Sequence, residues 1–294
     1  MSTTTKPVIH VGVDGSWRDN GALEWALQEA LLRHEPLRAV HVIDEQVRRS
    51  PYWESTVIDD AAMELVKDVQ QHLDANRGSL DHEMDLVVGP PAETLNRLAA
   101  GSRMLVVGRR GVGAFRRLLI GSTSEAVASD SPVPVVVVPD RWKPADHAGP
   151  VVLALDESGA DQAAMDFAVT AATERQLSLR LIHVWDLPKL YSWQAVDPAG
   201  LAEEVETDVR RHVNEIAERL RMKYPELVVE VDVWRGHPVD CVVRATDAWD
   251  AQLLVVGGRR RRLLTATLLG SVARGAVQHA KCPVAVVHEP VAES

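Results

Sequence analysis

Two loops in the chain combine glycines and arginines in a pattern that suits a phosphate group. The first has the sequence VVGRRGVGAFRRLLIGS (106–122), and the second has the sequence VVGGRRRRLLTATLLGS (255–271). Glycines let a backbone turn tightly and bring its amides close to an anion. A helix that opens at the Gly-Ser pair adds unbonded amides and a favourable dipole. Each loop therefore predicts a binding site for a small phosphorylated ligand.

The first loop has the fuller set of these residue types. Its glycines and arginines are Gly108, Gly111, Gly113, Gly121, Arg109, Arg110, Arg116 and Arg117. The alternative is a surface loop with solvated arginines, in which Ser122 only caps the following helix. The same 13-residue step from the first glycine to the Gly-Ser pair in both copies favours the phosphate site.

Other landmarks of the first half recur in the second, which indicates a duplicated domain. Asp14 and Asp156 lie 142 residues apart, as do His41 and His183, whereas the first glycines of the two loops lie 149 residues apart. The second copy therefore has seven extra residues, which we place in 187–200.

Strand and helix patterns alternate along each half. Apolar, β-branched runs predict strands, and helical periodicity predicts the helices between them. In the first half the strands are expected at 8–13, 38–43, 84–88, 104–107 and 135–138, and the helices at 20–33, 57–75, 91–100 and 121–129. In the second half the strands are expected near 150–155, 179–184, 228–233, 252–256 and 283–287. This order predicts an α/β fold of two tandem, doubly wound, five-stranded parallel-sheet domains.

The length of 294 residues suits two such domains. A segment rich in proline and charge, PDRWKPADHAGP (139–150), joins the halves. We expect the first domain at 1–142, a linker at 143–149 and the second domain at 150–294.

The end of the first predicted strand carries a second candidate site residue, Asp14. Ligands of open parallel sheets bind beyond the carboxyl ends of strands, where the strand order reverses. If the first and fourth strands are neighbours there, Asp14 and the first glycine loop flank one crevice. The alternative for Asp14 is a local Asp-Gly-Ser turn in which its carboxylate caps the backbone.

Composition narrows the functional classes. The net charge is −10, and the arginines gather in two short loops, so we expect a small anionic ligand and no nucleic acid. No apolar run is long enough to span a membrane. The N-terminal residues lack an export pattern, and two cysteines do not form a disulfide framework, so we expect a cytoplasmic protein. Walker and metal-binding motifs are absent from the sequence.

Several other residues are expected to serve packing. His41 and His183 fall in buried strands, where hydrogen-bonded core histidines are expected, and Cys282 is expected to pack. Trp25 falls on the first predicted helix and is also expected to pack.

The spacing G-x2-G-x9-G-[ST] after a Val-Val strand resembles the ATP-binding signature of the universal stress protein family. Gly108, Gly111, Gly121 and Ser122 fill it, and the segment His41-Val42-Ile43-Asp44 also resembles this family. The resemblance covers both halves and implies an adenine nucleotide alpha hydrolase-like fold with strand order 3-2-1-4-5. It also implies pairing through the fifth strands, either in a homodimer or between 134–138 and 283–287 in an internal pseudo-dimer.

The resemblance further implies a ligand, ATP with or without Mg²⁺, and the residues that contact it. Asp14 would lie near the ribose, the main chain around Val42 near adenine, and the signature residues near the phosphates. The candidate residues in the first half are Gly12, Asp14, Val42, Gly108, Gly111, Gly113, Gly121, Ser122 and Thr123. Those in the second half are Asp156, Val184, Gly257, Gly270, Ser271 and Val272. No catalytic residue or protein-held metal is expected.

The second loop departs from the signature. Arg260 replaces its second glycine, and Arg262 stands at the position of Gly113. Either the side chain of Arg260 weakens nucleotide binding, or the four arginines 259–262 replace amide contacts with charge and keep the site.

These observations favour a cytoplasmic, ATP-binding stress-response protein that is regulatory and has at most a weak ATPase activity. Its regulatory protein partner is not identifiable from the sequence. One alternative is a nucleotidyl-transfer enzyme of related fold. Another is an interaction module that does not depend on nucleotide.

Overall fold

The computed structural model describes residues 6–49, 54–76, 78–111, 119–143, 148–156, 162–186, 198–258, 261–263 and 266–289. The elements of the first half are β1 (Ile9–Gly12), α1 (Trp17–Asn20), α2 (Ala22–Arg33), β2 (Leu37–Ile43), α3 (Glu45–Arg48), α4 (Ser55–Asn76), β3 (His82–Val88), α5 (Pro91–Leu98), β4 (Met104–Gly108), α6 (Ser122–Asp130) and β5 (Val135–Val138). Those of the second half are β6 (Val151–Leu155), α7 (Gln162–Arg175), β7 (Leu179–Trp185), α8 (Pro198–Lys223), β8 (Val229–Arg235), α9 (Pro238–Ala248), β9 (Leu253–Gly257), β10 (Arg261–Leu263), β11 (Ala266–Leu268), α10 (Ser271–His279) and β12 (Val284–Val287).

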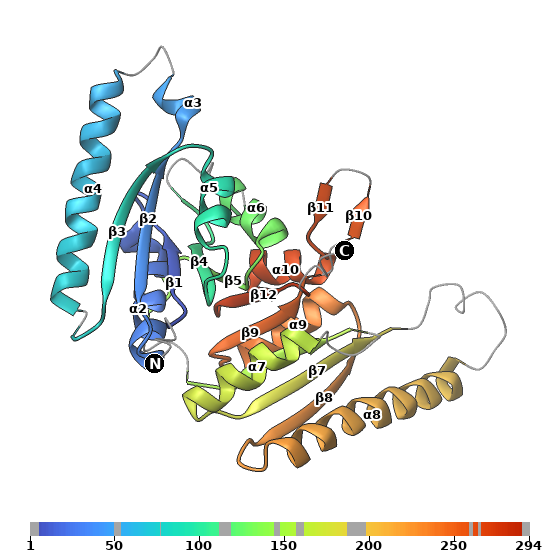
Figure 1. Cartoon of the computed structure of the whole chain (residues 1–294). Coiled ribbons are helices and arrows are strands. Elements are labelled where there is room, and N and C mark those ends of the chain that lie inside the picture. Colours follow the sequence, from blue (N-terminus) through green and yellow to red (C-terminus); the bar gives the residue numbers. More distant parts are fainter. Residues whose placement is uncertain are drawn as a thin grey trace, which may run out of the picture.

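One sheet of ten strands runs through both halves, in the order β3-β2-β1-β4-β5-β12-β9-β6-β7-β8 (Figure 1). Within each half the neighbouring strands are parallel. This confirms the predicted α/β fold with two parallel five-stranded units. The strand order of each half is the one that the resemblance implied.

The two halves join where β5 and β12 pair antiparallel, with Val137 opposite Val284 and Val135 opposite Val286. We call this junction, with the segments that flank it, the seam. Every residue of both strands is buried, as expected for strands covered on both faces. The sequence-based expectation of an internal pseudo-dimer through 134–138 and 283–287 is therefore confirmed.

Helices cover both faces of the sheet, and each face has its own apolar core (Figure 1). One core packs α2, α4, α7 and α8 against the strands, with Leu23, Leu73 and Leu181 fully buried. The other packs α5, α6, α9 and α10 on the opposite face, around residues such as Leu105 and Leu254. Each core continues from one half into the other, which fixes the halves relative to each other.

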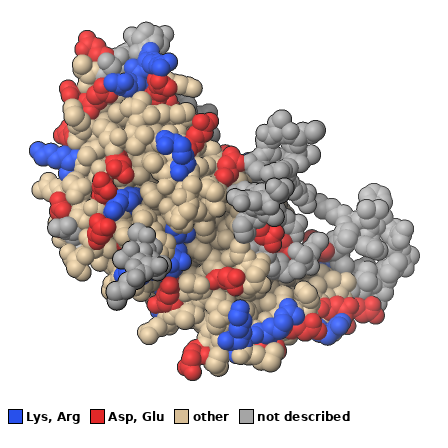
Figure 2. All heavy atoms as spheres, viewed as in Figure 1, with Lys and Arg blue, Asp and Glu red and all other residues tan. Residues whose placement is uncertain are grey.

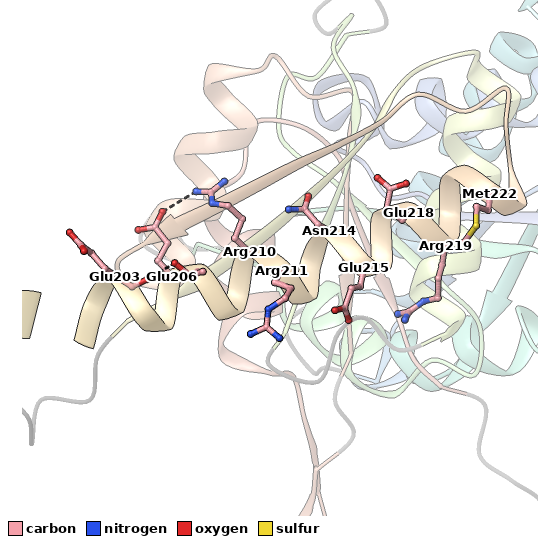
Figure 3. Close-up of a pocket in the computed structure, with 10 residues that line it drawn as sticks. Glu203, Glu206, Arg210, Arg211, Asn214, Glu215, Glu218, Arg219 and Met222 are labelled. Carbon is pink, nitrogen blue, oxygen red and sulfur yellow. Dashed lines mark hydrogen bonds and ion pairs between the residues drawn. The ribbon is translucent and has the colours of Figure 1, made fainter. Parts of the chain in front are cut away.

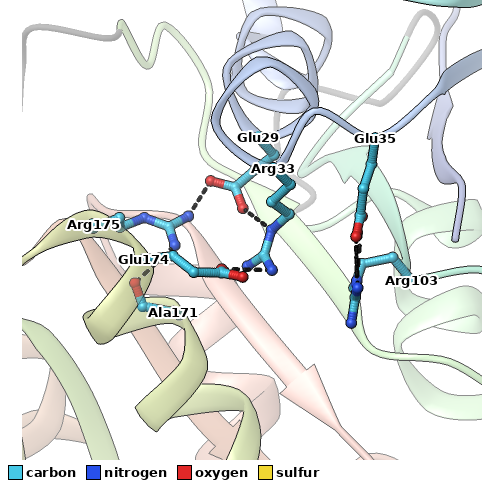
Figure 4. A network of polar contacts seen from close by, with 7 residues as sticks. All are labelled: Glu29, Arg33, Glu35, Arg103, Ala171, Glu174 and Arg175. Carbon is cyan, nitrogen blue, oxygen red and sulfur yellow. Dashed lines mark hydrogen bonds and ion pairs between the residues drawn. The ribbon is translucent and has the colours of Figure 1, made fainter. Parts of the chain in front are cut away.

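A buried ion-pair network links α2 to α7 across the seam (Figure 4). Arg33 contacts Glu29 at 3.2 Å and Glu174 at 2.5 Å, and Arg175 reaches the other oxygen of Glu29. The side chains of Glu29, Arg33 and Arg175 are at most 8% exposed. Desolvation by burial raises the pKa of Glu174. Removing one partner would leave buried charges unpaired, so this network favours a single arrangement of the two helices.

The predicted helix at 20–33 differs from the structure at its start. The helix is interrupted at Gly21, which has φ 70° and separates α1 from α2. A Cβ on Gly21 would lie 2.6 Å from the carbonyl oxygen of Trp142. Close approach to a distant segment therefore requires glycine here, and sequence periodicity does not reveal that contact.

Two short strands within the second glycine loop were not predicted. β10 and β11 pair antiparallel, with Arg262 opposite Thr267. Three-residue strands are too short to show an alternating pattern, so the sequence predicts only a loop.

The surface in Figure 2 shows acidic and basic side chains interspersed over the face in view. No helix within the described ranges is long and apolar enough to cross a membrane.

Candidate functional site

A cavity of about 420 Å³ lies beyond the carboxyl ends of β1, β2 and β4 in the first half. β1 pairs with β2 on one side and with β4 on the other, so the strand order reverses here. This is where open α/β sheets bind ligands, and the volume is in the range of small-molecule sites. The lining residues are Gly12, Val13, Asp14, Asn20, Val40, His41, Val42, Pro91, Leu95, Val107, Gly108, Arg110, Gly111, Gly121, Ser122, Thr123 and Ser124. We call it the first-half cavity.

The sequence-predicted residues of the first half meet in this cavity. Its lining includes Gly12, Asp14, Val42, Gly108, Gly111, Gly121, Ser122 and Thr123. Gly113, Arg116 and Arg117 lie outside the described residues. Positions more than 100 residues apart in the chain are thus adjacent in space.

Asp14 combines the two roles that its sequence context suggested. Its Oδ1 accepts hydrogen bonds from the backbone N of Ser16 at 2.9 Å and from Ser16 Oγ at 2.6 Å, which forms the expected local turn. It also lies in the cavity beside the glycine loop, since a Cβ on Gly111 would lie 2.1 Å from Asp14 Oδ2. Glycine at position 111 therefore lets the loop pass against this carboxylate.

Gly108, the last residue of β4, is closely packed against two polar side chains, those of Asn20 and Ser124. A Cβ there would lie 2.7 Å from Asn20 Nδ2, and Ser124 Oγ donates a hydrogen bond to the Gly108 carbonyl at 2.6 Å. Asn20 is buried, and its Oδ1 accepts from the backbone N of Ala22 at 3.0 Å. Asn20 was not identified as a site residue from the sequence, because its approach to Gly108 depends on packing between distant parts of the chain.

The N-terminus of α6 faces the cavity without a side-chain cap. Gly121 is the N-cap residue, with φ −74° and ψ 148°, and Ser122 is the first helical residue. The alternative interpretation of Ser122 as a helix cap is therefore wrong. The one acidic residue of the first turn, Glu125, pairs with Arg274 at 2.7 Å. The amides of this first turn lack intrahelical acceptors by geometry and suit an anion.

Apolar side chains also line the cavity. They are Val40 and Val42 of β2, Leu95 of α5 and Val107 of β4. β1 pairs with β2 only as far as Gly12 opposite Val40, so Val42 lies beyond the end of β1. The lining thus combines apolar side chains with the uncapped first turn of α6.

His41 lines the same cavity but is tied to the fold. Its Nδ1 lies 2.8 Å from the carbonyl oxygen of Val13. His183 in the second half is buried, and desolvation lowers its pKa. Cys282 is buried too, and burial raises the pKa of its thiol to about 12. Trp25 and Trp185 are buried in the core. These findings confirm the packing roles expected for the histidines, Cys282 and Trp25.

Two arginines of the first loop point to different places. Arg110 lines the cavity and contacts Asp140, with Nε 2.7 Å from Oδ2. Arg109 turns toward the seam, where its guanidinium donates to the carbonyl oxygens of Gln278 at 3.1 Å and Ala280 at 3.3 Å. Sequence analysis treated all the loop arginines alike, because it could not foresee contacts with the other half.

The candidate residues of the second half follow the same plan. Asp156 follows β6, and β6 pairs with β9, which ends at Gly257. Gly270 is the N-cap of α10 and Ser271 its first residue.

The other candidate residues of the second half lie in two of its described elements. Val184 lies in β7 and Val272 in α10. Arg260 and residues 157–161 and 187–197, which surround this region in sequence, lie outside the described residues. At the position that corresponds to Arg109 stands Gly258, and a Cβ there would lie 2.2 Å from the ring of His288.

Another hollow lies along the outer face of α8 (Figure 3). Its described lining residues all belong to that one helix, so no other described element forms an opposing wall. Charged side chains there pair with one another, as Arg210 does with Glu206 at 2.9 Å. Exposed pairs of this kind are typical of a solvated helix face, so we do not assign a ligand to it.

Comparison with known proteins agrees with this plan. The model of the universal stress protein family matches residues 7–139 and 148–288. A universal stress protein of Mycolicibacterium smegmatis is 33% identical, over 98% of this chain and 99% of its own length. One of Mycobacterium bovis is 29% identical, over 96% of this chain and 97% of its own length.

A solved structure supports the fold. The structure of a universal stress protein from Archaeoglobus fulgidus has a TM-score of 0.70 and 19% identity, and the match covers 96% of this chain and 98% of that one. The family match, the relatives and the two halves of the fold agree: the chain belongs to the universal stress protein family, with one family segment in each half.

Proposed function

We propose that this protein binds ATP in the first-half cavity and acts as a regulatory stress-response protein in the cytoplasm. One observation carries the proposal. The glycine signature and Asp14, found independently in the sequence, line a single cavity that also presents apolar side chains and the uncapped start of α6. An adenine nucleotide combines a base with phosphates in the same way.

The contacts follow from this combination. The phosphates would meet Gly108, Gly111 and the first turn of α6 at Ser122, where backbone amides and the helix dipole favour negative charge. Arg110 lines the same cavity and would add charge. These contacts select a phosphorylated ligand over a neutral one.

The remainder of the nucleotide would lie between Asp14 and the apolar side chains. The Asp14 carboxylate suits ribose hydroxyls as an acceptor. Val42 and Leu95 would pack on the adenine ring, with the main chain of β2 beside its polar edge. Because these contacts involve the adenine ring, the proposed site should bind a nucleotide in preference to a phosphate group alone.

The proposal includes at most slow hydrolysis. Among the described lining residues the one carboxylate is Asp14, which already accepts two hydrogen bonds from Ser16. His41, the histidine of this lining, is held by the Val13 carbonyl. Neither is placed as a general base for water. The described residues also include no cluster of three His, Cys, Asp or Glu that could hold a metal ion, so Mg²⁺ would enter on the phosphates.

We further propose that the second half binds nucleotide weakly, because Arg260 replaces a signature glycine. The pairing of β5 with β12 occupies the fifth-strand edges of both halves. One chain therefore supplies the pair of domains, and we propose it as the functional unit without a second copy.

Isothermal titration calorimetry with ATP tests the proposal. We expect saturable binding by the wild type, and weaker binding by Asp14→Asn, which keeps the shape of the side chain but removes its charge. The matched control is Asp156→Asn in the second half, which should bind as the wild type does. Absence of heat at millimolar ATP, with ADP and AMP also silent, would contradict nucleotide binding altogether.

A further inference from the structure

A second cavity, of about 340 Å³, lies at the seam. It is lined by Arg109 after β4, by the segment that follows β5, and by the segment between α10 and β12. The lining residues are Arg109, Pro139, Asp140, Arg141, Trp142, His279, Ala280 and Lys281. We call it the seam cavity. Both halves build it, so it exists only in the tandem arrangement.

The seam cavity is basic in a chain of net charge −10. Arg109, Arg141 and Lys281 face it with Asp140 as the one carboxylate in its described lining. Asp140 is also shared, because both Arg109 and Arg110 contact its Oδ2. One negative charge therefore serves two guanidinium groups, and the surplus at the cavity is positive.

Arg141 is held in an unusual backbone conformation beside this surplus. Its φ is 61°, a left-handed value that costs a non-glycine residue about 1 kcal/mol. Its backbone N donates to the carbonyl oxygen of Asp19 at 2.8 Å, and the next residue, Trp142, is anchored in the core at 7% exposure. Within the described residues Arg141 has no ion-pair partner.

The remaining cations also keep unused hydrogen-bonding capacity. Nε of Arg109 is buried and has no acceptor among the described residues. Lys281 forms an ion pair with Asp247 at 2.7 Å, but the side chain is 70% exposed and the pair is weak. An oxyanion between these groups would accept charge-assisted hydrogen bonds from several donors at once.

We propose that the seam cavity binds a small free oxyanion of the inorganic phosphate class. Arg141 and Lys281 are its principal ligands, one from each half, and Arg109 forms the charged floor. The guanidinium groups match a tetrahedral oxyanion. The site is separate from the first-half cavity, since Arg141 and Lys281 do not line that cavity.

Calorimetric titration with inorganic phosphate, at low and constant ionic strength, tests this site. The wild type should bind one phosphate with saturating ATP present, which keeps the first-half cavity occupied. The double variant Arg141→Gln and Lys281→Gln should bind phosphate on the order of tenfold more weakly, because two positive charges are lost. Both side chains are exposed, so the fold should be retained.

The matched control is the double variant Arg210→Gln and Arg211→Gln on α8, which should bind phosphate as the wild type does. The proposal is overturned if ATP abolishes the phosphate signal of the wild type, or if no saturable signal is found. Equal affinity in the wild type and the seam variant also overturns it. ATP binding is measured in a separate titration. If ATP does not bind, the phosphate affinities of the wild type and of the Arg141→Gln and Lys281→Gln double variant still decide whether the seam cavity binds phosphate.

Discussion

Replacing Gly121 with alanine should weaken ligand binding in the first-half cavity while leaving the fold intact. A Cβ at Gly121 would lie 3.6 Å from the carbonyl oxygen of Arg109, its nearest neighbour, which is ordinary contact. Its φ of −74° is open to alanine. By contrast, a Cβ at Gly108 or Gly111 would overlap side-chain atoms of the protein itself. Gly121→Ala is therefore a test of ligand contact that spares the packing.

The expected magnitudes follow from this geometry. Loss of glycine at an N-cap costs about 0.5–1 kcal/mol, and the stiffer unfolded chain offsets about 0.4–1 kcal/mol. Stability should therefore stay within about 1 kcal/mol of the wild type. With the phosphates placed as proposed, however, a methyl group at the start of α6 would take the space of a phosphate oxygen. Losing one hydrogen bond to a charged group weakens binding by about 1.5–3 kcal/mol, or roughly 10- to 100-fold.

Gly270→Ala is the matched control, because Gly270 is the N-cap of α10 and a Cβ there meets no described residue within 4 Å. We expect ATP titration calorimetry to show weak binding for Gly121→Ala and wild-type binding for Gly270→Ala, with similar urea denaturation midpoints. Wild-type ATP affinity in Gly121→Ala would refute the placement of the phosphates. Equal losses in both variants would refute the preference for the first half.

Three further predictions concern stability. Glu29→Ala removes the carboxylate that buried Arg175 contacts, while Arg33 keeps Glu174, so urea denaturation should show a loss of about 3–5 kcal/mol. Glu206→Ala in an exposed helix pair should change stability by less than about 0.5 kcal/mol, and similar losses in the two variants would contradict the role of the network. His288 lies 2.8 Å from the carbonyl oxygens of both Gly258 and Ala128, so His288→Ala should lower stability by about 1–3 kcal/mol, and an unchanged midpoint would argue against this link across the seam. Burial lowers the pKa of folded His183, so the unfolded chain binds a proton at this residue more readily and stability is lost as pH falls below about 6.5. The denaturation midpoint of His183→Gln should therefore depend less on pH in that range than the midpoint of the wild type. An equal pH dependence in the two proteins would contradict this role of His183.

Much of the fold was accessible from the sequence because its signals are local. The apolar runs that form β5 and β12 are short and buried on both faces, and the helices between strands keep a regular period. The break at Gly21 was not accessible, because it depends on the approach of Trp142 from the end of the first half. The same holds for β10 and β11, whose pairing leaves no periodic trace.

The same distinction between local sequence signals and long-range contacts applies to the candidate site. Asp14 and Gly111 were identified from residue type and spacing, and the structure places them in contact. Asn20 was missed because its role comes from packing against Gly108. The opposite directions of Arg109 and Arg110 were missed because they depend on Asp140 and on the C-terminal end of α10 in the other half. Contacts between the halves are properties of the assembled sheet.

Counting nucleotides per chain tests the central claim most directly. Native mass spectrometry of the purified protein, titrated with ATP, should show one nucleotide bound per chain at saturation, and that adduct should be lost in Gly121→Ala. Two nucleotides per chain of similar affinity would contradict the assignment of ATP to the first half. A single adduct that persists in Gly121→Ala and disappears in Gly270→Ala would place the working site in the other half.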